Sequence, residues 1–298
     1  MRSCYAKGAV MKYRNLKLSF TIENVKFQVL SIGLEKMHTP IPRHSHSKNS
    51  YELHYISYGY GTLIADEKEY SIVPGTFFMT GPGVFHEQIS LPEDPMTEYG
   101  VYLQISFTTP YEKSSGLMQE FLDHKFWIGP ADPGIHELMK QIHTELENQD
   151  AGYDLMLPSL LQQLLLMIIR GYRKSELSDG YKSPVTALPL PNDQTYLTIE
   201  EAFLYNYRDL TLEKLADLVH LGKRQTERLL KKHYNKTFLQ KKTEARMSAA
   251  CLLLQDANVS IASVAYELGY SSSEHFTNAF KTFYHMTPSA YRTGHPTL

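Results

Sequence analysis

Histidine and glutamate side chains that can bind a ligand or a metal are concentrated between residues 44 and 86. His44 and His46 are two residues apart, so on a strand both side chains leave the same face. Glu52 and His54 follow, and His86 ends the later stretch PGTFFMTGPGVFH. Three imidazoles and one carboxylate, those of His44, His46, Glu52 and His86, suit a divalent iron, manganese, nickel or zinc ion. The same groups can instead hydrogen-bond an organic ligand. We expect that use for all five residues, with no metal or other cofactor.

A second chemical feature is the basic stretch GKRQTERLLKKHYN at 222–235. If it forms a helix, the three- and four-residue spacing gives it distinct faces. The face that can pack on a core holds Thr226, Leu229, Leu230 and His233, and another face holds Arg224, Glu227, Arg228 and Lys231. Long donors on the second face suit phosphates and guanine edges in a DNA major groove.

The positive charge of the chain is concentrated around this stretch. The formal net charge is −2, yet residues 222–246 hold nine basic side chains against two acidic ones. A nucleic-acid interface has this kind of local basic footprint. The sequence therefore predicts DNA binding despite the slightly acidic total.

Short segments rich in Tyr, Phe, Ile and Val, divided by turn-forming residues, surround the histidines. Such segments predict strands, here at Phe27–Ile32, Tyr51–Tyr58, Thr62–Ala65, Tyr70–Val73, Thr76–Met79 and Gly100–Phe107. Many short strands with regular turns indicate a sandwich or a small barrel. The 21 Tyr and 13 Phe of the chain favour a ligand-lined cavity.

Residues 114–172 change to a helical period of apolar side chains. The segment Leu160–Ile169 is apolar around most of its circumference, more than one buried face requires. It is either a central helix wedged against the barrel or a helix-to-helix dimer interface. We favour the interface, with Pro158 at a kink or in the first turn. The Pro-, Ser- and Gly-rich stretch 175–195 predicts a linker.

The basic stretch belongs to a pattern that occurs twice. A support helix from Asp209 and a turn at His220 to Gly222 precede it, and the same order recurs from Ser260, with Gly269 at the turn. The support helices are offset by 49 residues and the second helices by 50, so the second turn is one residue longer. Two helices joined by a tight turn predict a helix-turn-helix. A helix over 238–254 joins the two copies.

The amino-acid composition limits the classes of protein to which the chain can belong. With 298 residues, 42% of them hydrophobic and 21% charged, two soluble globular domains are expected. Cys4 and Cys251 are the only cysteines, so neither a disulfide framework nor a Cys-based zinc site is expected. We find no signal segment and no apolar run long enough to span a bilayer. We expect a cytoplasmic protein with no membrane partner.

Two resemblances to known families follow from these residues. The stretches HSHSKNSYELHYISYG and PGTFFMTGPGVFH resemble the two motifs of the cupin barrel. The stretch IASVAYELGYSSSEHFTNAFKTFYHMTPSAYR closely resembles the signature of the AraC/XylS family of bacterial transcriptional regulators. The second resemblance implies a cupin-like sensor of a small molecule, dimerising helices after the barrel and a DNA-binding domain. Gly222 and Thr226 depart from the family pattern, in which a Ser or Asp cap and a packing Leu are common, so we expect the first recognition helix to be less firmly seated.

The predicted fold class is α+β multidomain. Residues 1–110 are predicted to form a cupin-like ligand-sensing barrel, 111–174 a helical dimerisation segment, 175–194 a linker, and 195–298 an all-α domain with two helix-turn-helix motifs joined by a linker helix. The predicted DNA-binding residues are Arg224, Glu227, Arg228, Lys231, Ser273, Glu274, Thr277, Asn278 and Lys281.

The predicted function is that of a non-enzymatic, ligand-responsive transcription regulator. It binds promoter or operator DNA, senses a small metabolite such as a carbohydrate and forms a homodimer, with RNA polymerase as a further candidate partner. Two alternatives stay open. A cupin metalloenzyme with a DNA-binding tail would use His44, His46, Glu52 and His86 as metal ligands. A DNA-binding protein without a ligand would use its barrel only to dimerise.

Overall fold

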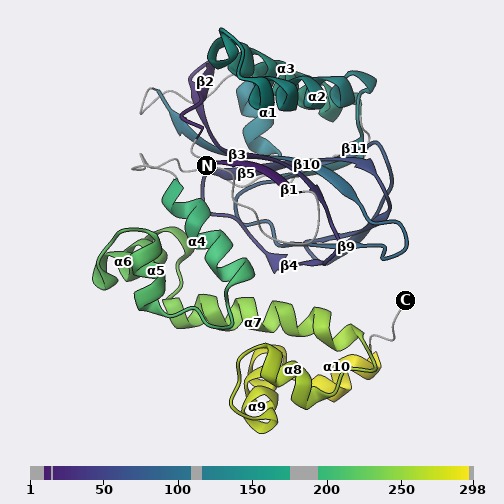
Figure 1. The fold of residues 1–298 in the computed structure, drawn as a ribbon, viewed down its shortest axis with the longest axis vertical. Coiled ribbons are helices and arrows are strands. Elements are labelled where there is room, and N and C mark those ends of the chain that lie inside the picture. Colours follow the sequence, from purple (N-terminus) through teal and green to yellow (C-terminus); the bar gives the residue numbers. More distant parts are fainter. Residues whose placement is uncertain (1–9, 15, 109–115, 175–193, 295–298) are drawn as a thin grey trace. The chain divides into compact units, whose positions relative to one another are not determined.

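The computed structural model describes residues 10–14, 16–108, 116–174 and 194–294. They form two compact units, one from the described residues up to 194 without 40–44, and the other from 195–294 with 40–44. The first unit is made of sheets and helices, and the second is helical (Figure 1). Segment 40–44 contains a strand that is described with the sheet to which it is hydrogen-bonded. The predicted linker at 175–194 lies outside the described residues except for Gln194.

The first unit contains two β-sheets. The larger has the strand order β1-β3-β10-β5-β8-β11, with β2 paired to β3, and the smaller has the order β4-β9-β6-β7. The strands are β1 (Val10–Arg14), β2 (Ser19–Ile22), β3 (Val25–Lys36), β4 (Ile41–His44), β5 (Ser50–Tyr58), β6 (Gly61–Ala65), β7 (Lys68–Ile72), β8 (Thr76–Thr80), β9 (His86–Ser90), β10 (Thr97–Phe107) and β11 (Phe126–Pro130). Each predicted strand overlaps an observed one, and the two-sheet architecture confirms the predicted fold class.

Strand β5 shows how the larger sheet separates apolar from polar side chains. Successive side chains of a strand point to opposite faces. Tyr51, Leu53 and Tyr55 join the apolar core of the unit, so Glu52 and His54 point to the other face. One short strand therefore supplies both core packing and candidate chemistry.

The neighbouring strand β10 repeats this division. Val101 and Leu103 lie in the same core. The pairing register places Gly100 opposite His54, and Glu98 shares a face with Gly100 because the two are two positions apart along the strand. The polar faces of β5 and β10 therefore coincide.

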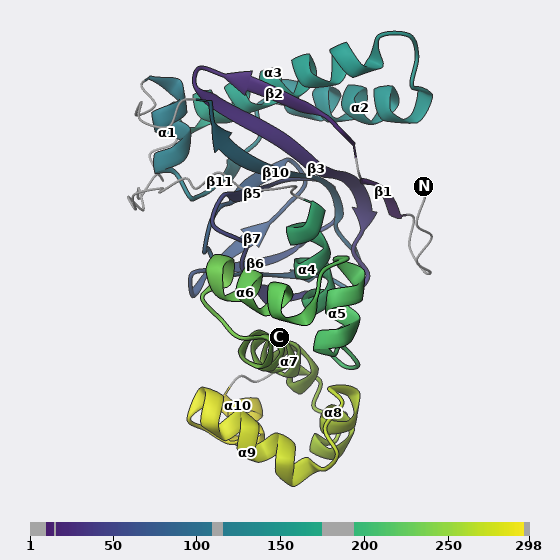
Figure 2. The ribbon, with the colours of Figure 1, turned by 90° about the vertical axis from the view of Figure 1, so that its left-hand side faces the viewer.

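Three helices cover the apolar face of the larger sheet (Figure 2). They are α1 (Leu117–Asp123), α2 (Pro133–Asn148) and α3 (Tyr153–Lys174). Asp132 caps α2 by accepting a hydrogen bond from the Gly134 N–H at 3.1 Å, and Pro133 occupies its first turn, where a missing N–H costs nothing. Each helix contributes buried apolar residues to the core that contains Tyr51 and Leu53.

The segment Leu160–Ile169 is part of this core. Five of its side chains are at most 1% exposed within the single chain, namely Leu161, Leu164, Leu165, Ile168 and Ile169. This corrects the favoured prediction: packing on the barrel of the same chain accounts for the apolar circumference, as the central-helix alternative stated. Tyr153–Gly171 is long and apolar enough to cross a membrane by length and composition, and 39% of this window is buried inside the protein. Pro158 lies inside α3 rather than in its first turn.

Strand β11 interrupts the segment that was predicted to be helical. It pairs antiparallel with β8, from Phe126 opposite Thr80 to Pro130 opposite Thr76. Its Trp127 is 5% exposed and belongs to the core. The larger sheet therefore extends beyond the predicted barrel boundary at residue 110.

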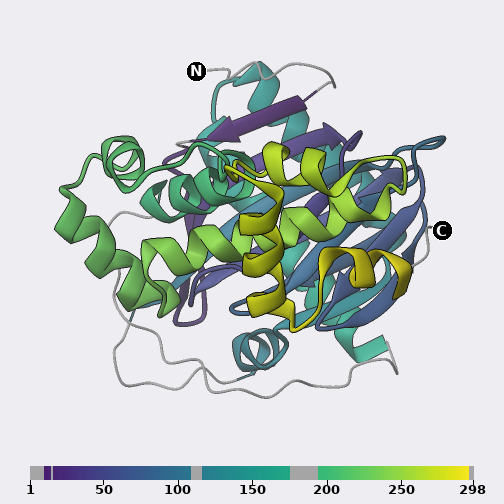
Figure 3. The same ribbon diagram turned by 90° about the horizontal axis from the view of Figure 1, so that it is seen from below.

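The second unit contains seven helices within its described residues, 194–294. They are α4 (Gln194–Tyr205), α5 (Leu212–Leu218), α6 (Lys223–Tyr234), α7 (Phe238–Gln255), α8 (Ile261–Glu267), α9 (Ser273–Tyr284) and α10 (Pro288–Gly294). The sequence patterns did not predict α4. The unit has two apolar cores, and α7 takes part in both, through Phe238 in one and through Met247 and Leu254 in the other. Figure 3 shows α7 as the long yellow-green helix between the green and yellow helices.

His143 of α2 is a buried titratable group in the core of the first unit. Its ring is 5.0 Å from that of Tyr99 and 6.1 Å from that of Tyr13, both edge-on. Burial lowers the pKa of His143 from 6.5 to about 4, and the nearby backbone of Gly33 offsets this only in part. The folded state therefore binds this proton less well than the unfolded state does.

We predict that His143→Leu weakens the pH dependence of stability. Because the folded pKa is depressed, the contribution of His143 is fully present above pH 6.5 and is lost as the pH falls towards 4. The free energy of unfolding of the wild type should fall by about 2 kcal/mol more than that of the variant between about pH 7.5 and about pH 5. Urea unfolding followed by the fluorescence of Trp127, the only tryptophan, measures this. Parallel pH profiles would contradict the assignment.

Candidate functional site

Two helix pairs with the same layout lie in the second unit. Helices α5 and α6 form the first pair, and α8 and α9 form the second. The leading helices begin 49 residues apart and the following helices 50 residues apart, so the turn of the second pair is one residue longer. The structure thus confirms the spacing predicted from the sequence.

Side-chain caps start three of these helices. The hydroxyls of Thr211, Ser260 and Ser272 each accept a hydrogen bond from a backbone N–H three residues on, at 3.0–3.2 Å. Helix α6 begins differently, because Gly222 has no side chain. There the Gln225 side chain accepts a hydrogen bond from the Gly222 N–H at 3.3 Å. That bond is one half of a capping box.

Polar contacts help to seat helix α6. Thr226 is fully buried, and its hydroxyl donates to the Gly222 carbonyl at 3.2 Å. His233, about two helical turns after Thr226, is also buried. Its Nε2 lies 2.7 Å from the Tyr196 hydroxyl of α4. The two rings are 4.5 Å apart. Leu230 is also fully buried. Helix α6 therefore packs through polar as well as apolar contacts, which an apolar sequence pattern alone does not reveal.

Aromatic packing seats helix α9. Phe276 and Phe280 are fully buried, and Tyr291 of α10 lies edge-on 5.6 Å from Phe280. Arg292 donates to the Val259 carbonyl at 2.7 Å and so ties α10 to the turn before α8. Phe276, Phe280, Tyr291 and Arg292 belong to the stretch that resembles the family signature, and they stabilise the packing of this unit.

The predicted DNA-binding residues lie on the other side of the two helices. All four candidates on α6 are exposed, and on α9 three are exposed and two half-buried. The exposed residues are Arg224, Glu227, Arg228, Lys231, Glu274, Asn278 and Lys281, and the half-buried ones are Ser273 and Thr277. The outward orientation agrees with the prediction, and their contact with DNA stays a prediction.

The basic window around α6 is only partly directed outward. Lys236 forms an ion pair with Glu244 at 2.6 Å. Arg246 donates to the Arg208 carbonyl at 2.8 Å and thereby joins α7 to the loop before α5. Some of the nine basic residues therefore hold the helices together, which the charge count could not distinguish from a DNA-binding role.

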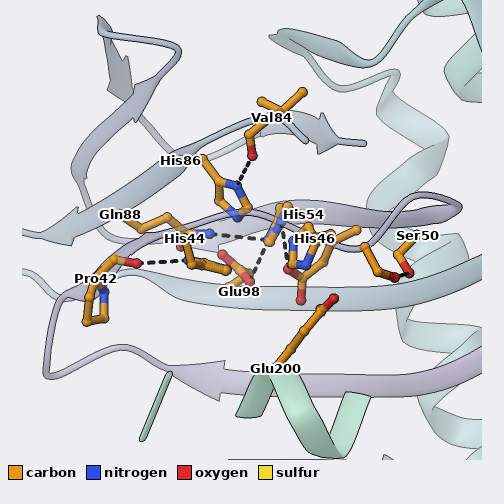
Figure 4. A network of polar contacts seen from close by, with 12 residues as sticks. Pro42, His44, His46, Ser50, His54, Val84, His86, Gln88, Glu98 and Glu200 are labelled. Atoms are coloured by element: carbon orange, nitrogen blue, oxygen red, sulfur yellow. Dashed lines mark hydrogen bonds and ion pairs between the residues drawn. The ribbon is translucent and has the colours of Figure 1, made fainter. Parts of the chain in front are cut away.

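Four of the predicted ligand-binding residues converge. His44, His46, Glu52 and His86 each offer a nitrogen or oxygen atom, and these atoms all lie within 4.8 Å of one another. We call this group the interior cluster (Figure 4). Its members come from β4, β5, β9 and the segment between β4 and β5.

Backbone carbonyls orient two of the imidazoles. His44 Nδ1 lies 2.8 Å from the Pro42 carbonyl, and His86 Nδ1 lies 3.2 Å from the Val84 carbonyl. A carbonyl only accepts, so each Nδ1 carries a proton, and in the neutral ring each Nε2 carries the lone pair. The neutral form of each ring therefore directs a lone pair rather than an N–H away from that carbonyl.

The fifth predicted residue, His54, borders the interior cluster. Its Nδ1 donates to Glu98 Oε1 at 2.8 Å, its Nε2 is 3.5 Å from Glu52 Oε2, and its ring stacks on Phe78 at 4.2 Å. Burial opposes the charged form of His54, but the carboxylates of Glu98 and Glu52 outweigh it and raise the pKa of His54. The Gln88 amide nitrogen is also 3.3 Å from His54 Nδ1.

Sequence reasoning missed Glu98, Gln88 and Tyr196. Glu98 and Gln88 reach His54 across 44 and 34 residues of sequence, through strand pairing that no local motif encodes. Tyr196 was passed over because helix α4 was not predicted. A strand register for β5 and β10 would have pointed to Glu98, since Gly100 and His54 are paired.

Comparison with known families covers both units. A model of the AraC-like ligand binding domain matches residues 32–165, and a helix-turn-helix domain model matches residues 215–294. Together they span more than half of the chain. The chain belongs to the AraC family of transcriptional regulators. It is accordingly a transcription regulator with an N-terminal ligand-binding domain and a C-terminal helix-turn-helix domain that binds DNA.

Three relatives match most of their own length. An HTH-type transcriptional regulator of Haemophilus influenzae is 26% identical over 80% of this chain and 85% of that protein. The Msm operon regulatory protein of Streptococcus mutans serotype c is 22% identical over 95% and 98%. The raffinose operon transcriptional regulatory protein RafR of Pediococcus pentosaceus is 25% identical over 91% and 96%. The similarity between this chain and the three relatives therefore extends across both units.

We predict that Tyr196→Phe destabilises the helical unit. The change removes the hydrogen bond with His233, which should cost about 0.5–1.5 kcal/mol. Urea unfolding followed by far-ultraviolet circular dichroism measures it. Tyr266→Phe is the matched control because Tyr266 is 68% exposed, and it should change stability by less than about 0.5 kcal/mol. Equal effects of the two changes would contradict the role of Tyr196.

Proposed function

We propose that α6 and α9 are two DNA-reading helices that enter successive major grooves of an operator. The observation that carries this is that both present outward side chains at corresponding helix positions while their opposite faces are buried. On α6, Arg224, Arg228 and Lys231 would reach bases or phosphates, and Glu227 would accept a hydrogen bond from cytosine. On α9, the contacts would come from Ser273, Glu274, Thr277, Asn278 and Lys281.

The two helices would contribute differently to DNA binding. The outer face of α6 carries three cations and one acid, whereas that of α9 carries one cation, one acid and short hydrogen-bonding groups. Cations supply phosphate affinity, and short polar groups read base edges. We therefore assign more of the phosphate affinity to α6 and more of the base discrimination to α9.

The effector site would lie at the interior cluster and His54. Glu52 and His54 sit on the face of β5 that is turned away from the apolar core, and the histidines of the cluster lie close to Glu52, where these groups can orient a polar small molecule. A carbohydrate is the favoured class, because the name of one relative concerns the raffinose operon. Effector binding would act on DNA binding as a coupling between two sites.

The proposal also covers organisation and assembly. We assign sensing to residues 1–110, dimerisation to 111–174, the linker to 175–194 and DNA binding to 195–298, and we propose a cytoplasmic homodimer without catalytic activity. Contact with RNA polymerase would follow from action at promoters. Exposed Leu155 and Met156, at 74% and 49%, support α3 as a candidate dimer contact; the buried part of Leu160–Ile169 is used within the chain.

We predict that Arg228→Ala weakens binding to duplex DNA selected by the wild type from a random pool. If Arg228 reads a base, the loss should be about 1–3 kcal/mol and specificity should relax at one position. If it contacts a phosphate, the loss should be uniform and the salt dependence should decrease by about one counterion. Gel-shift titrations at several salt concentrations distinguish the two.

Lys140→Ala is the matched control for Arg228→Ala. It also removes one cation from a helix, but Lys140 lies on α2 of the first unit. Its DNA affinity should equal that of the wild type. Unchanged affinity of Arg228→Ala would refute the assignment of α6, and equal losses in both variants would show a general charge effect.

We predict that a carbohydrate raises the thermal unfolding midpoint of the first unit. A ligand that binds only the folded state stabilises it by mass action. Raffinose and a panel of mono- and disaccharides are the probes, and Trp127 fluorescence is the readout. Glu52→Gln, which keeps the size of the side chain and removes its charge, should abolish the shift. If no sugar of the panel shifts the wild type, the carbohydrate assignment is wrong.

A further inference from the structure

Segment 206–211, between α4 and α5, contributes to both halves of the second unit. The first half holds α5 and α6, and the second half holds α8 and α9. Leu210 lies in the same core as Leu230 of α6, whereas Tyr207 packs against the core that contains Phe276 of α9. Among the described residues, the two cores have no buried member in common. We call this segment the bridge segment, because it joins cores that are otherwise separate.

Arg208 of the bridge segment reaches the second half through its side chain. Its guanidinium carbon lies 4.8 Å from the centre of the Tyr266 ring, and its Nη1 lies 3.7 Å from the carboxylate of Glu267. Both partners belong to α8. A cation over an aromatic face and a partly exposed ion pair are each weak. Here both contacts hold the same side chain against the same helix.

Arg246 of α7 connects the bridge segment with the turn between α8 and α9. It donates to the Arg208 carbonyl at 2.8 Å and, through a longer hydrogen bond, to the Gly269 carbonyl at 3.4 Å. Its guanidinium carbon lies 5.0 Å from the centre of the Tyr270 ring. A guanidinium is planar and presents several donors in a fixed arrangement. One side chain therefore links three parts of the unit.

Gly269 shows how closely these parts approach one another. Its φ of +76° lies in the left-handed region that favours glycine. A Cβ at this position would lie 3.0 Å from a guanidinium nitrogen of Arg246 and 3.1 Å from the carbonyl oxygen of Arg208. The bridge segment and the turn of the second helix pair are therefore in direct contact, with no room for a side chain between them.

A second cation of α7 holds the bridge segment in place. Lys242 Nζ donates to the Leu210 carbonyl at 2.6 Å. Lys242 and Arg246 are four residues apart, so both side chains leave the same side of α7. Hydrogen bonds from charged donors are stronger than those between neutral groups. The bridge segment is thus attached to α7 at two points, and Arg208 extends this attachment to α8.

The bridge segment restricts a motion that α7 alone leaves open. Two halves attached to one helix keep their separation along its axis, but only the packing of each core opposes rotation about that axis. A second attachment beside the axis opposes this rotation directly. Orientation matters for reading DNA, because each base pair changes the position of a subsite by about 3.4 Å and its direction by about 36°.

We propose that Arg208 and Arg246 are positioning residues that determine which spacing of two operator subsites α6 and α9 read together. The inference rests on the proposed function, because it requires that both helices enter the DNA. It assigns a part of the sequence specificity to side chains that need not touch a base. The base pairs between the subsites are then selected by their number rather than by contact.

The spacing of the selected subsites tests this proposal. The full chain selects duplexes from a random pool, and sequencing gives the number of base pairs between the two subsites. The wild type should accept one spacing, and insertion of one base pair should weaken its binding about 10-fold or more, as mismatches in one subsite would. Gel-shift titrations at a fixed salt concentration measure this insertion penalty.

Arg246→Ala should bind the selected duplex more weakly and also lose its strict spacing. Its insertion penalty should fall to about 3-fold or less, because a loosely linked pair of binding elements tolerates a wider range of spans. Arg208→Ala should lower the penalty in the same way. A purely structural role would weaken binding to both duplexes equally and leave the penalty unchanged.

Variants of α8 test the coupling from the other side without opening a cavity. Tyr266 is 68% exposed, so Tyr266→Ala removes the ring beside Arg208 and leaves the core packed. It should lower the insertion penalty, whereas Tyr266→Phe keeps the ring and should behave as the wild type does. With Arg208→Ala, these variants decide the question even if Arg246→Ala does not fold.

Arg292→Ala is the matched control for Arg246→Ala. Arg292 is also half-buried and donates to two carbonyls, those of Leu254 at 3.2 Å and Val259 at 2.7 Å. Both acceptors pack in the core of the second half, so the change should lower stability and keep the insertion penalty of the wild type. A wild-type penalty in both Arg246→Ala and Arg208→Ala, or an equal fall in Arg292→Ala, would overturn the proposal.

The same selection separates this inference from the proposed function. A wild type that selects a single subsite would refute the pair of reading helices and the inference with it. Two subsites whose spacing varies in the wild type would refute only the coupling. The same holds for two subsites at one spacing whose insertion penalty is unchanged in the arginine variants.

Discussion

The two-residue period of strands β5 and β10 is the constraint on which the first unit depends. Tyr51 and Leu53 pack under the helices, and Glu52 and His54 occupy the alternate positions. A register slip of one residue would exchange the two sets. It would bury a carboxylate among leucines, which is strongly unfavourable. The apolar core and the polar cluster therefore specify the same register from opposite faces.

The second unit applies the helical period to a similar division. On α9 the buried phenylalanines alternate with outward polar residues, and on α6 a buried threonine and histidine take the place of apolar groups. The stretch that identifies the family includes buried residues that pack in this unit. Phe276, Phe280 and Arg292 hold the helices in place, whereas the outward residues Asn278 and Lys281 are exposed.

Local patterns predicted much of this molecule. Strand alternation, the support helices expected from Asp209 and Ser260, and the offsets of 49 and 50 residues are all properties of nearby residues. The predictions that failed depended on contacts between residues far apart in the sequence. The apolar residues of α3 look the same whether their partner is the same chain or another one, so periodicity could not exclude a dimer interface. Strand β11 is short and ends in Gly129 and Pro130, and only its pairing with β8 makes it a strand.

The candidate site shows the same limit. The chain order of His44, His46, Glu52 and His86 was enough to name a cluster, because strand geometry and motif resemblance both applied. The sequence did not show which residues belong to the cluster and which only border it, because Glu98 meets His54 only through the register of paired strands. Likewise, counting cations around α6 could not separate Arg228, which is exposed, from Lys236, which is paired with Glu244.

Helix α7 has a consequence for folding. Its first turn belongs to the core beneath α6, and its later turns belong to the core beneath α9. Melting either core would remove one end of the helix from its packing and destabilise the other end, because a helix of this length has little stability of its own in water. The two halves are thus expected to unfold as one cooperative transition. A chain in which only one of α6 and α9 keeps its packing would be a rare species, so the two helices would be presented together or not at all.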